Sequence, residues 1–154
     1  MHIMKLSIKA LEVAVSQLGK QESPPGSNWG EPVKTYLSSV GITFPAPWCM
    51  AFVYWCYELA SNQLNLNNTA IKTGGVLAAW NKVTQNIKSS TPQIGSVFIM
   101  DFGKGQGHTG LVENFDNQFI YTIEGNTNDT GSREGFKVSR RKRPRSTIKG
   151  YLNY

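Results

Sequence analysis

Residues 45–56, PAPWCMAFVYWC, place a cysteine where a helix is expected to begin. Prolines precede a long apolar run, and because proline cannot continue a helix, the run predicts a buried helix over residues 48–62 with Cys49 in its first turn. The unpaired N–H groups and the positive end of the helix dipole favour an anion there. Since the thiolate attacks carbonyl carbon, Cys49 is a candidate nucleophile. The alternative is a small buried apolar residue, as free cysteines usually are.

A cysteine nucleophile needs a base, and the sequence offers two histidines. His2 lies in a terminus that we expect to be frayed. His108 follows the glycine-rich loop FGKGQG and opens a predicted strand, HTGLVENF. His108 is therefore the candidate base, and the alternative is a half-buried strand histidine without a chemical role.

A carboxylate is expected beside His108. A tight turn at residues 116–117 would pair the strand of His108 with the next one, QFIYTIEG. Counting from this turn sets His108 opposite Gly125, and a bulge or a loop longer by one residue sets it opposite Glu124. Asn126 shares the face of Glu124 because it lies two residues further on. The alternative for Glu124 is a surface charge at the end of a strand.

Cysteine, histidine and a polar orienting group are what acyl transfer through a thioester requires. The base takes the thiol proton, the third group orients the imidazole, and an N–H at the helix N-terminus stabilises the oxyanion. A zinc site made of the same residue types is an alternative, but a single cysteine and a single histidine lack the paired spacing of zinc ligands. We therefore expect neither a metal nor a cofactor.

The elements that must position these groups change in character along the chain. Amphipathic helices are predicted before Gly19, over residues 31–40 and 48–62, and within TGGVLAAWNKV. From residue 94 onward, short β-rich runs alternate with turns: IGSVFIMD, HTGLVENF, QFIYTIEG, GFKVSRRK and TIKGYLNY. The order predicts an α+β domain in which N-terminal helices pack on a C-terminal antiparallel sheet of five or six strands.

Length and composition fit a single domain over residues 1–154. The sequence is 17% charged and 40% hydrophobic, and it contains no stretch long enough to span a bilayer. A net charge of +6 suggests an anionic partner, a bacterial envelope or a nucleic acid. No nucleic-acid-binding motif is present, so we expect no nucleic acid partner. Cys49 and Cys56 are too far apart on one helix for a disulfide, so both should be free thiols.

Several motifs together resemble the CHAP domains (cysteine, histidine-dependent amidohydrolase/peptidase), papain-like hydrolases that cut bacterial peptidoglycan. The matching segments are PWCMAFVYWC, GHTGLV and TIEGNT, with ESPPGSNWG upstream, so the resemblance covers nearly the whole chain. It implies that Cys49 is the nucleophile, His108 the base, Glu124 the orienting acid and Asn126 a following polar residue of the site. Some phage lysins of this type carry an aspartate-rich calcium loop before the cysteine. No such loop is present here, so calcium is not expected.

Two further features have alternative interpretations. Asn28, Trp29 and Trp48 lie in turns near the cysteine and are candidate substrate-binding residues, whereas core packing is the alternative for the tryptophans. The basic run SRRKRPR, residues 139–145, is either a solvated edge or a contact for an anionic wall polymer.

The resemblance implies cleavage of an amide bond in the peptide part of peptidoglycan through a thioester on Cys49. The motifs leave open whether the enzyme is an amidase or an endopeptidase, because pocket shape decides between them. The alternative is a non-catalytic wall-binding or phage-structural module with the same fold. The N-terminus lacks a signal-peptide pattern, so we expect synthesis in the cytoplasm and action at the cell wall or in the periplasm. Release would need a holin or a secretion apparatus, an immunity protein is a further candidate partner, and a monomer is expected.

Overall fold

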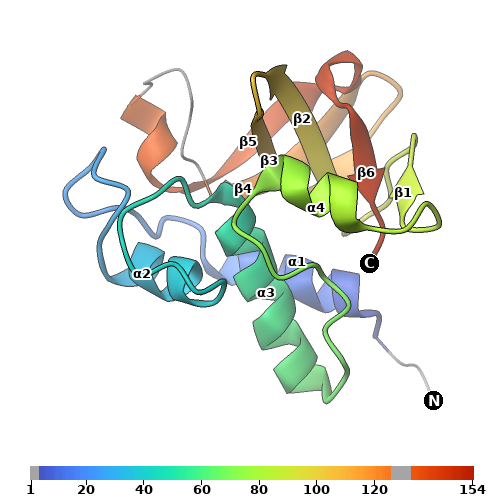
Figure 1. The fold of residues 1–154 in the computed structure, drawn as a ribbon. Coiled ribbons are helices and arrows are strands. Elements are labelled where there is room, and N and C mark those ends of the chain that lie inside the picture. The colour runs from blue at the N-terminus through green and yellow to red at the C-terminus, as the bar shows by residue number, and fades with distance from the viewer. Residues whose placement is uncertain (1–3, 126–132) are drawn as a thin grey trace.

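Helices form the first part of the chain in the computed structural model, which describes residues 4–125 and 133–154 (Figure 1). The helices are α1 (Leu6–Ser16), α2 (Glu31–Ser38), α3 (Cys49–Leu64) and α4 (Val76–Lys82). Each lies where the sequence predicts a helix, and α3 begins at Cys49 itself. None of the helices in this part of the chain is both long and apolar enough to cross a membrane.

A six-stranded sheet with antiparallel neighbours follows, as the sequence predicts. Its spatial order is β1-β6-β2-β3-β4-β5. The strands are β1 (Lys88–Ser89), β2 (Val97–Gly103), β3 (Gln106–Phe115), β4 (Phe119–Gly125), β5 (Val138–Pro144) and β6 (Gly150–Leu152), with short 3-10 helices at Arg133–Phe136 and Arg145–Thr147. The sequence does not predict β1, because two residues are too few to show an alternation.

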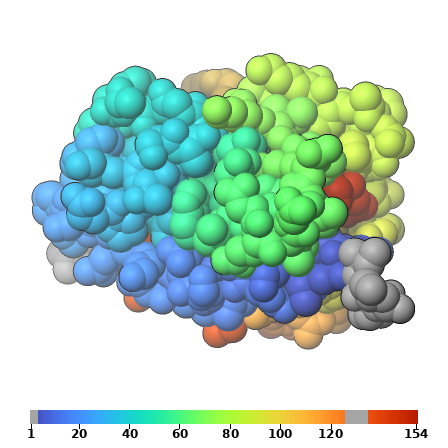
Figure 2. Space-filling view, turned by 90° about the horizontal axis from the view of Figure 1, so that it is seen from below, coloured from blue at the N-terminus to red at the C-terminus, as the bar shows by residue number. Residues whose placement is uncertain are grey.

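The helices cover one face of the sheet, and α3 is the central element of the core. Seen from below, the left and centre of the surface belong to the N-terminal half of the chain, in blue to green (Figure 2). Apolar residues of α1 and α3 pack with alternate residues of the strands, among them Val97, Ile99, Leu111 and Ile123. The intervening residues form a second, smaller cluster on the other face: Phe98, Met100, Val112, Ile120 and Tyr151.

The first turn of α3 lies against the end of β4. A Cβ atom added to Gly125 would come within 2.7 Å of the Trp48 ring and 2.8 Å of the Phe52 Cβ atom. Glycine is thus required for this close approach, since real Cβ atoms do not come so near to other heavy atoms. The contact places the N-terminus of α3, and with it Cys49, beside β3 and β4 (Figure 1).

The register of the β3–β4 hairpin differs from both predicted registers. The loop spans three residues rather than two, because the Asp116 N–H donates to the Phe119 carbonyl and the Asp116 carboxylate accepts the N–H groups that follow. A bulge lies between Val112 and Asn114, and Leu111 pairs with Ile123. One step further along, Glu124 lies against Gly110 rather than opposite His108. The prediction of a directly opposite pair is therefore wrong, although both side chains lie on the same face of the sheet.

Candidate active site

Cys49 and His108 meet at the junction of the helical layer and the sheet. Cys49 is the first residue of α3 and its exposed fraction is 5%, while His108 on β3 is 3% exposed. The Cys49 side chain interacts with the imidazole of His108 and contributes to raising the pKa of the histidine. The structure thus brings together the two residues that the sequence selects as nucleophile and base.

Glu124 contacts the imidazole of His108 as well, at the ring nitrogen Nε2. His108 Nε2 lies 2.7 Å from Glu124 Oε1, and the exposed fraction of the carboxylate is 0%. Because Nε2 is occupied by Glu124, Nδ1 is the ring nitrogen left to face Cys49. Glu124 is therefore a buried partner of His108, and the alternative of a surface charge does not describe it.

Gly110 makes room for this contact between neighbouring strands. A Cβ atom at this position would lie 2.7 Å from Glu124 Cγ and 2.8 Å from the Phe98 ring. The Glu124 side chain occupies that space and reaches across β3 to His108. The glycine in the motif GHTGLV thus has a direct role in the geometry of the site.

Two residues that the sequence analysis missed also bind Glu124. Thr122 Oγ1 donates to Oε2 at 2.6 Å. Arg143 donates twice, from Nε to Oε2 at 2.7 Å and from Nη2 to Oε1 at 2.6 Å. The two-residue period of a strand over the basic run SRRKRPR separates Arg141 and Arg143 from Arg140 and Lys142, but it does not say which of the two sets faces Glu124.

The electrostatics of this cluster favour a charged pair. Burial lowers the pKa of His108, but hydrogen bonds and charge interactions with Cys49 and Glu124 outweigh it and raise the pKa to about 9. Burial raises the pKa of Glu124, and this is outweighed by Arg143 and His108, which bring the pKa to about 2. These interactions therefore stabilise the carboxylate anion and the imidazolium, which is the form of His108 that carries a proton accepted from Cys49.

Trp48 packs in the core rather than in a cleft. Its exposed fraction is 0%, and its ring stacks on Tyr36 with centroids 5.6 Å apart. Its indole N–H donates to the buried carboxylate of Glu22 at 2.8 Å. The ring offers no surface to a substrate, so the core-packing alternative describes Trp48, and this residue instead fixes the backbone directly before Cys49.

The loop before α2 holds the other two candidate substrate-binding residues. Asn28 and Trp29 are half-buried, and the Asn28 N–H donates to Glu22 at 3.0 Å. Glu22 thereby connects this loop to Trp48 through its two carboxylate oxygens. The sequence analysis did not identify Glu22 as a residue of this region. Asn126 lies outside the described residues.

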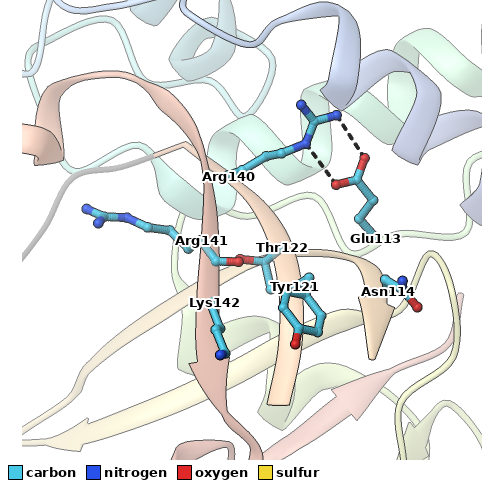
Figure 3. Close-up of a pocket in the computed structure, with 7 residues that line it drawn as sticks. All are labelled: Glu113, Asn114, Tyr121, Thr122, Arg140, Arg141 and Lys142. Carbon is cyan, nitrogen blue, oxygen red and sulfur yellow. Dashed lines mark hydrogen bonds and ion pairs between the residues drawn. The ribbon is translucent and has the colours of Figure 1, made fainter. Parts of the chain in front are cut away.

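The basic run divides between two environments. Arg140 and Lys142 are exposed on β5, where Arg140 makes two hydrogen bonds with Glu113 at 2.9 and 3.1 Å. A groove of about 550 Å³ is lined by Glu113, Asn114, Tyr121, Thr122, Arg140, Arg141 and Lys142, and the Arg141 side chain extends away from those of Arg140 and Lys142 (Figure 3). The solvated-edge interpretation thus fits the outward half of the run, while Arg143 belongs to the candidate site.

Among the described residues, Cys56 has no histidine partner of the kind that Cys49 has. Both cysteines are free, as predicted, and Cys56 is completely buried in α3. Burial raises the pKa of its thiol well above the usual value. Within the described ranges, no three histidine, cysteine, aspartate or glutamate side chains are grouped so that they could hold a metal ion.

Comparison with known proteins assigns the family. The family model described as "CHAP domain" matches residues 41–126, more than half of the 154 residues, so the chain belongs to the CHAP-domain family. The matched segment contains Cys49, His108 and Glu124. No curated protein sequence matches this chain.

Two crystal structures share the fold at low sequence identity. One is of Ly7917, with a TM-score of 0.56 and 15% identity, and the other is of a wild type endolysin, LysIME-EF1, with a TM-score of 0.55 and 14% identity. The alignments cover 97% of this chain but only 62% and 64% of those two chains. The likeness supports the papain-like α+β fold, and the chain spans less than two thirds of either structure.

Proposed function

We propose that this protein is a peptidoglycan hydrolase that cleaves an amide bond in the peptide part of the bacterial cell wall through a thioester on Cys49. The observation that carries the proposal is the buried series of side-chain contacts that runs from Cys49 to His108 and from His108 to Glu124. Membership of the CHAP-domain family supports it. The name endolysin, given to one protein with the same fold, is consistent with this substrate.

In the proposed reaction, His108 takes the proton of Cys49 and the thiolate attacks the amide carbonyl carbon. The tetrahedral intermediate collapses, the C–N bond breaks, and the imidazolium gives its proton to the leaving amine. Water, deprotonated by His108, then attacks the thioester, which releases the acid and restores the thiol. Glu124 holds the imidazole and stabilises its positive charge in both halves of the reaction.

The start of α3 is suited to the developing oxyanion. The first backbone hydrogen bond of the helix runs from the Phe52 N–H to the Trp48 carbonyl. The N–H of Cys49 precedes it, among the N–H groups that a helix leaves without an internal acceptor. We assign this N–H as one oxyanion donor.

Asn28 and Trp29 are the residues we propose for contact with the wall peptide or the adjoining sugar. Their loop is tied through Glu22 to the residue before the nucleophile, so a ligand bound there would lie near Cys49. Asn126 follows Glu124 closely in the chain and is proposed as a supporting polar residue. We further propose that the enzyme acts at the wall after release through a holin or a secretion apparatus.

Digestion of purified peptidoglycan tests the proposal and identifies the bond. Mass spectrometry of the soluble products should show a newly exposed amine, either on a stem or cross-bridge residue, for an endopeptidase, or at the L-alanine released from the sugar, for an amidase. The Cys49→Ala variant, with circular dichroism as a check on folding, is the control. A folded wild-type protein that binds walls without releasing any amine would instead support a non-catalytic binding module.

A further inference from the structure

Arg143 stands out because no step of the proposed reaction uses it, yet it makes the most extensive contact in the site. We propose that Arg143 is a positioning residue that fixes both oxygens of Glu124, so that the carboxylate is held ionised and correctly oriented against His108. This inference rests on the proposed function, since it concerns how the Cys49–His108–Glu124 site is organised.

The geometry is that of a bidentate pair. The guanidinium uses Nε and Nη2, one for each carboxylate oxygen, at 2.7 and 2.6 Å. Such planar, two-point pairing fixes orientation as well as distance, which a single contact does not. One oxygen, Oε1, is the same atom that meets His108 Nε2, so the position of Arg143 directly sets where the imidazole can lie.

The burial of Glu124 explains why a second cation is needed. The exposed fraction of Glu124 is 0%, and an ionised carboxylate removed from water is costly unless its oxygens are paired. His108 and Thr122 each supply one contact. Arg143 supplies a permanent positive charge, so Glu124 stays an anion even when His108 has given up its proton during the reaction.

The same strand offers a matched control. Arg140 also forms a two-point pair, with Glu113, at 2.9 and 3.1 Å. Its side chain is 57% exposed, against 24% for Arg143, and its partner Glu113 is 29% exposed, against 0% for Glu124. Replacing either arginine removes one charge and one bidentate pair from β5, but only Arg143 touches the partner of His108.

Several charged and titratable groups surround Glu124 and His108. His108 approaches from β3 and Arg143 from β5, and Arg141 lies on the same face of β5 at the register position of Thr122. Cys49 reaches the imidazole from α3. Removing the positive charge of Arg143 would make proton uptake easier at both Glu124 and His108, so both should titrate at higher pH.

The test compares the rate of Cys49 alkylation by iodoacetamide, as a function of pH, in wild type, Arg143→Met, Arg143→Lys and Arg140→Met. We expect the Arg143→Met profile to move to higher pH and kcat on peptidoglycan to fall about ten- to a hundredfold. Arg143→Lys keeps the charge but loses the two-point geometry, so its pH profile should stay near that of wild type while kcat falls by a smaller factor. Arg140→Met should change neither.

An unchanged pH profile in Arg143→Met would overturn the proposal, even if kcat fell, because a purely structural role would not move the titration. If Arg143→Met does not fold, an Arg143→Lys variant with wild-type kcat and alkylation would overturn it equally. The alkylation readout needs no peptidoglycan. A wild-type protein that shows His108-dependent alkylation but digests no wall would therefore refute the proposed function while leaving the role of Arg143 intact.

Discussion

The two cysteines of α3 share a helix and a low exposure, yet their surroundings differ in kind. Cys49 is 5% exposed and Cys56 is 0% exposed, so burial hardly separates them. Cys49 has the His108 imidazole as a partner, and that imidazole is in turn bound by Glu124. Burial alone raises the pKa of Cys56. The comparison teaches that a chain of polar partners, rather than exposure, marks a candidate nucleophile.

Removing either end of the Cys49–His108 pair should have the largest effect. We expect Cys49→Ala and His108→Ala to reduce peptidoglycan turnover by at least about 10³-fold, because one lacks the bond-forming sulfur and the other the proton acceptor. Turnover is measured as release of new amines, and circular dichroism checks the fold. Persistent turnover by Cys49→Ala would mean that Cys49 is not the nucleophile, and the polar partners would then not distinguish it from Cys56.

Glu124→Gln should have a smaller effect on activity. Glutamine keeps the shape of the side chain but has no negative charge, and its NH₂ group would face either His108 or Arg143, both of which are donors. We expect kcat to fall about 10²-fold with a modest change in KM. A variant with wild-type kcat at neutral pH would mean that the carboxylate does not support the imidazolium.

The helices, the sheet and the three central site residues were predictable from the sequence because they depend on local patterns. Apolar periodicity and the prolines before Cys49 locate α3, and glycine-bounded alternation locates β3 and β4. The register was not predictable, since it depends on a bulge after Val112 and a three-residue loop that leave little trace in the sequence. The sequence leaves Trp48 between a cleft and the core, because its burial depends on Tyr36 and Glu22, which are distant in the chain.

The role of Arg143 shows a different limit. Judged by composition alone, the five basic residues within SRRKRPR indicate a solvated edge. Only the pairing of β5 with β4, in which Glu124 lies opposite Ser139, shows which alternate residues share a face with the site. Glu124 and Ser139 are 15 residues apart in the chain, so their pairing is long-range information that the single sequence does not visibly encode.

The ionic partners of the site should also make stability depend on pH. The pKa of His108 is raised from 6.5 to about 9, so its contribution is complete below pH 6.5 and is lost as pH rises toward 9. The pKa of Glu124 is lowered from 4.5 to about 2, so its contribution is complete above pH 4.5 and is lost as pH falls toward 2. Both contributions are present between pH 4.5 and 6.5, where stability should be greatest.

Urea unfolding at several pH values measures this dependence. Between about pH 5.5 and 8.5 the free energy of unfolding should decrease on the order of 2 kcal/mol in wild type and by less in Glu124→Gln. Cys56→Ser is the control, because its substitution leaves the His108–Glu124 pair in place. Equal pH dependence in wild type and Glu124→Gln would show that this pair does not govern the effect.

Cys56→Ser should change activity least. Cys56 is completely buried among apolar residues of α3, and a serine hydroxyl there costs about 1–3 kcal/mol unless it finds an acceptor. A helical serine can donate to the carbonyl four residues earlier, which would reduce that cost. We therefore expect a lower melting temperature, with kcat/KM and inactivation by iodoacetamide unchanged.

Peptide mapping of the alkylated wild type and the alkylated Cys56→Ser variant should find the label on Cys49 in both proteins. Preferential labelling of Cys56 with parallel loss of activity would reverse the assignment, because it would mean that the buried thiol, rather than the partner of His108, reacts with the substrate.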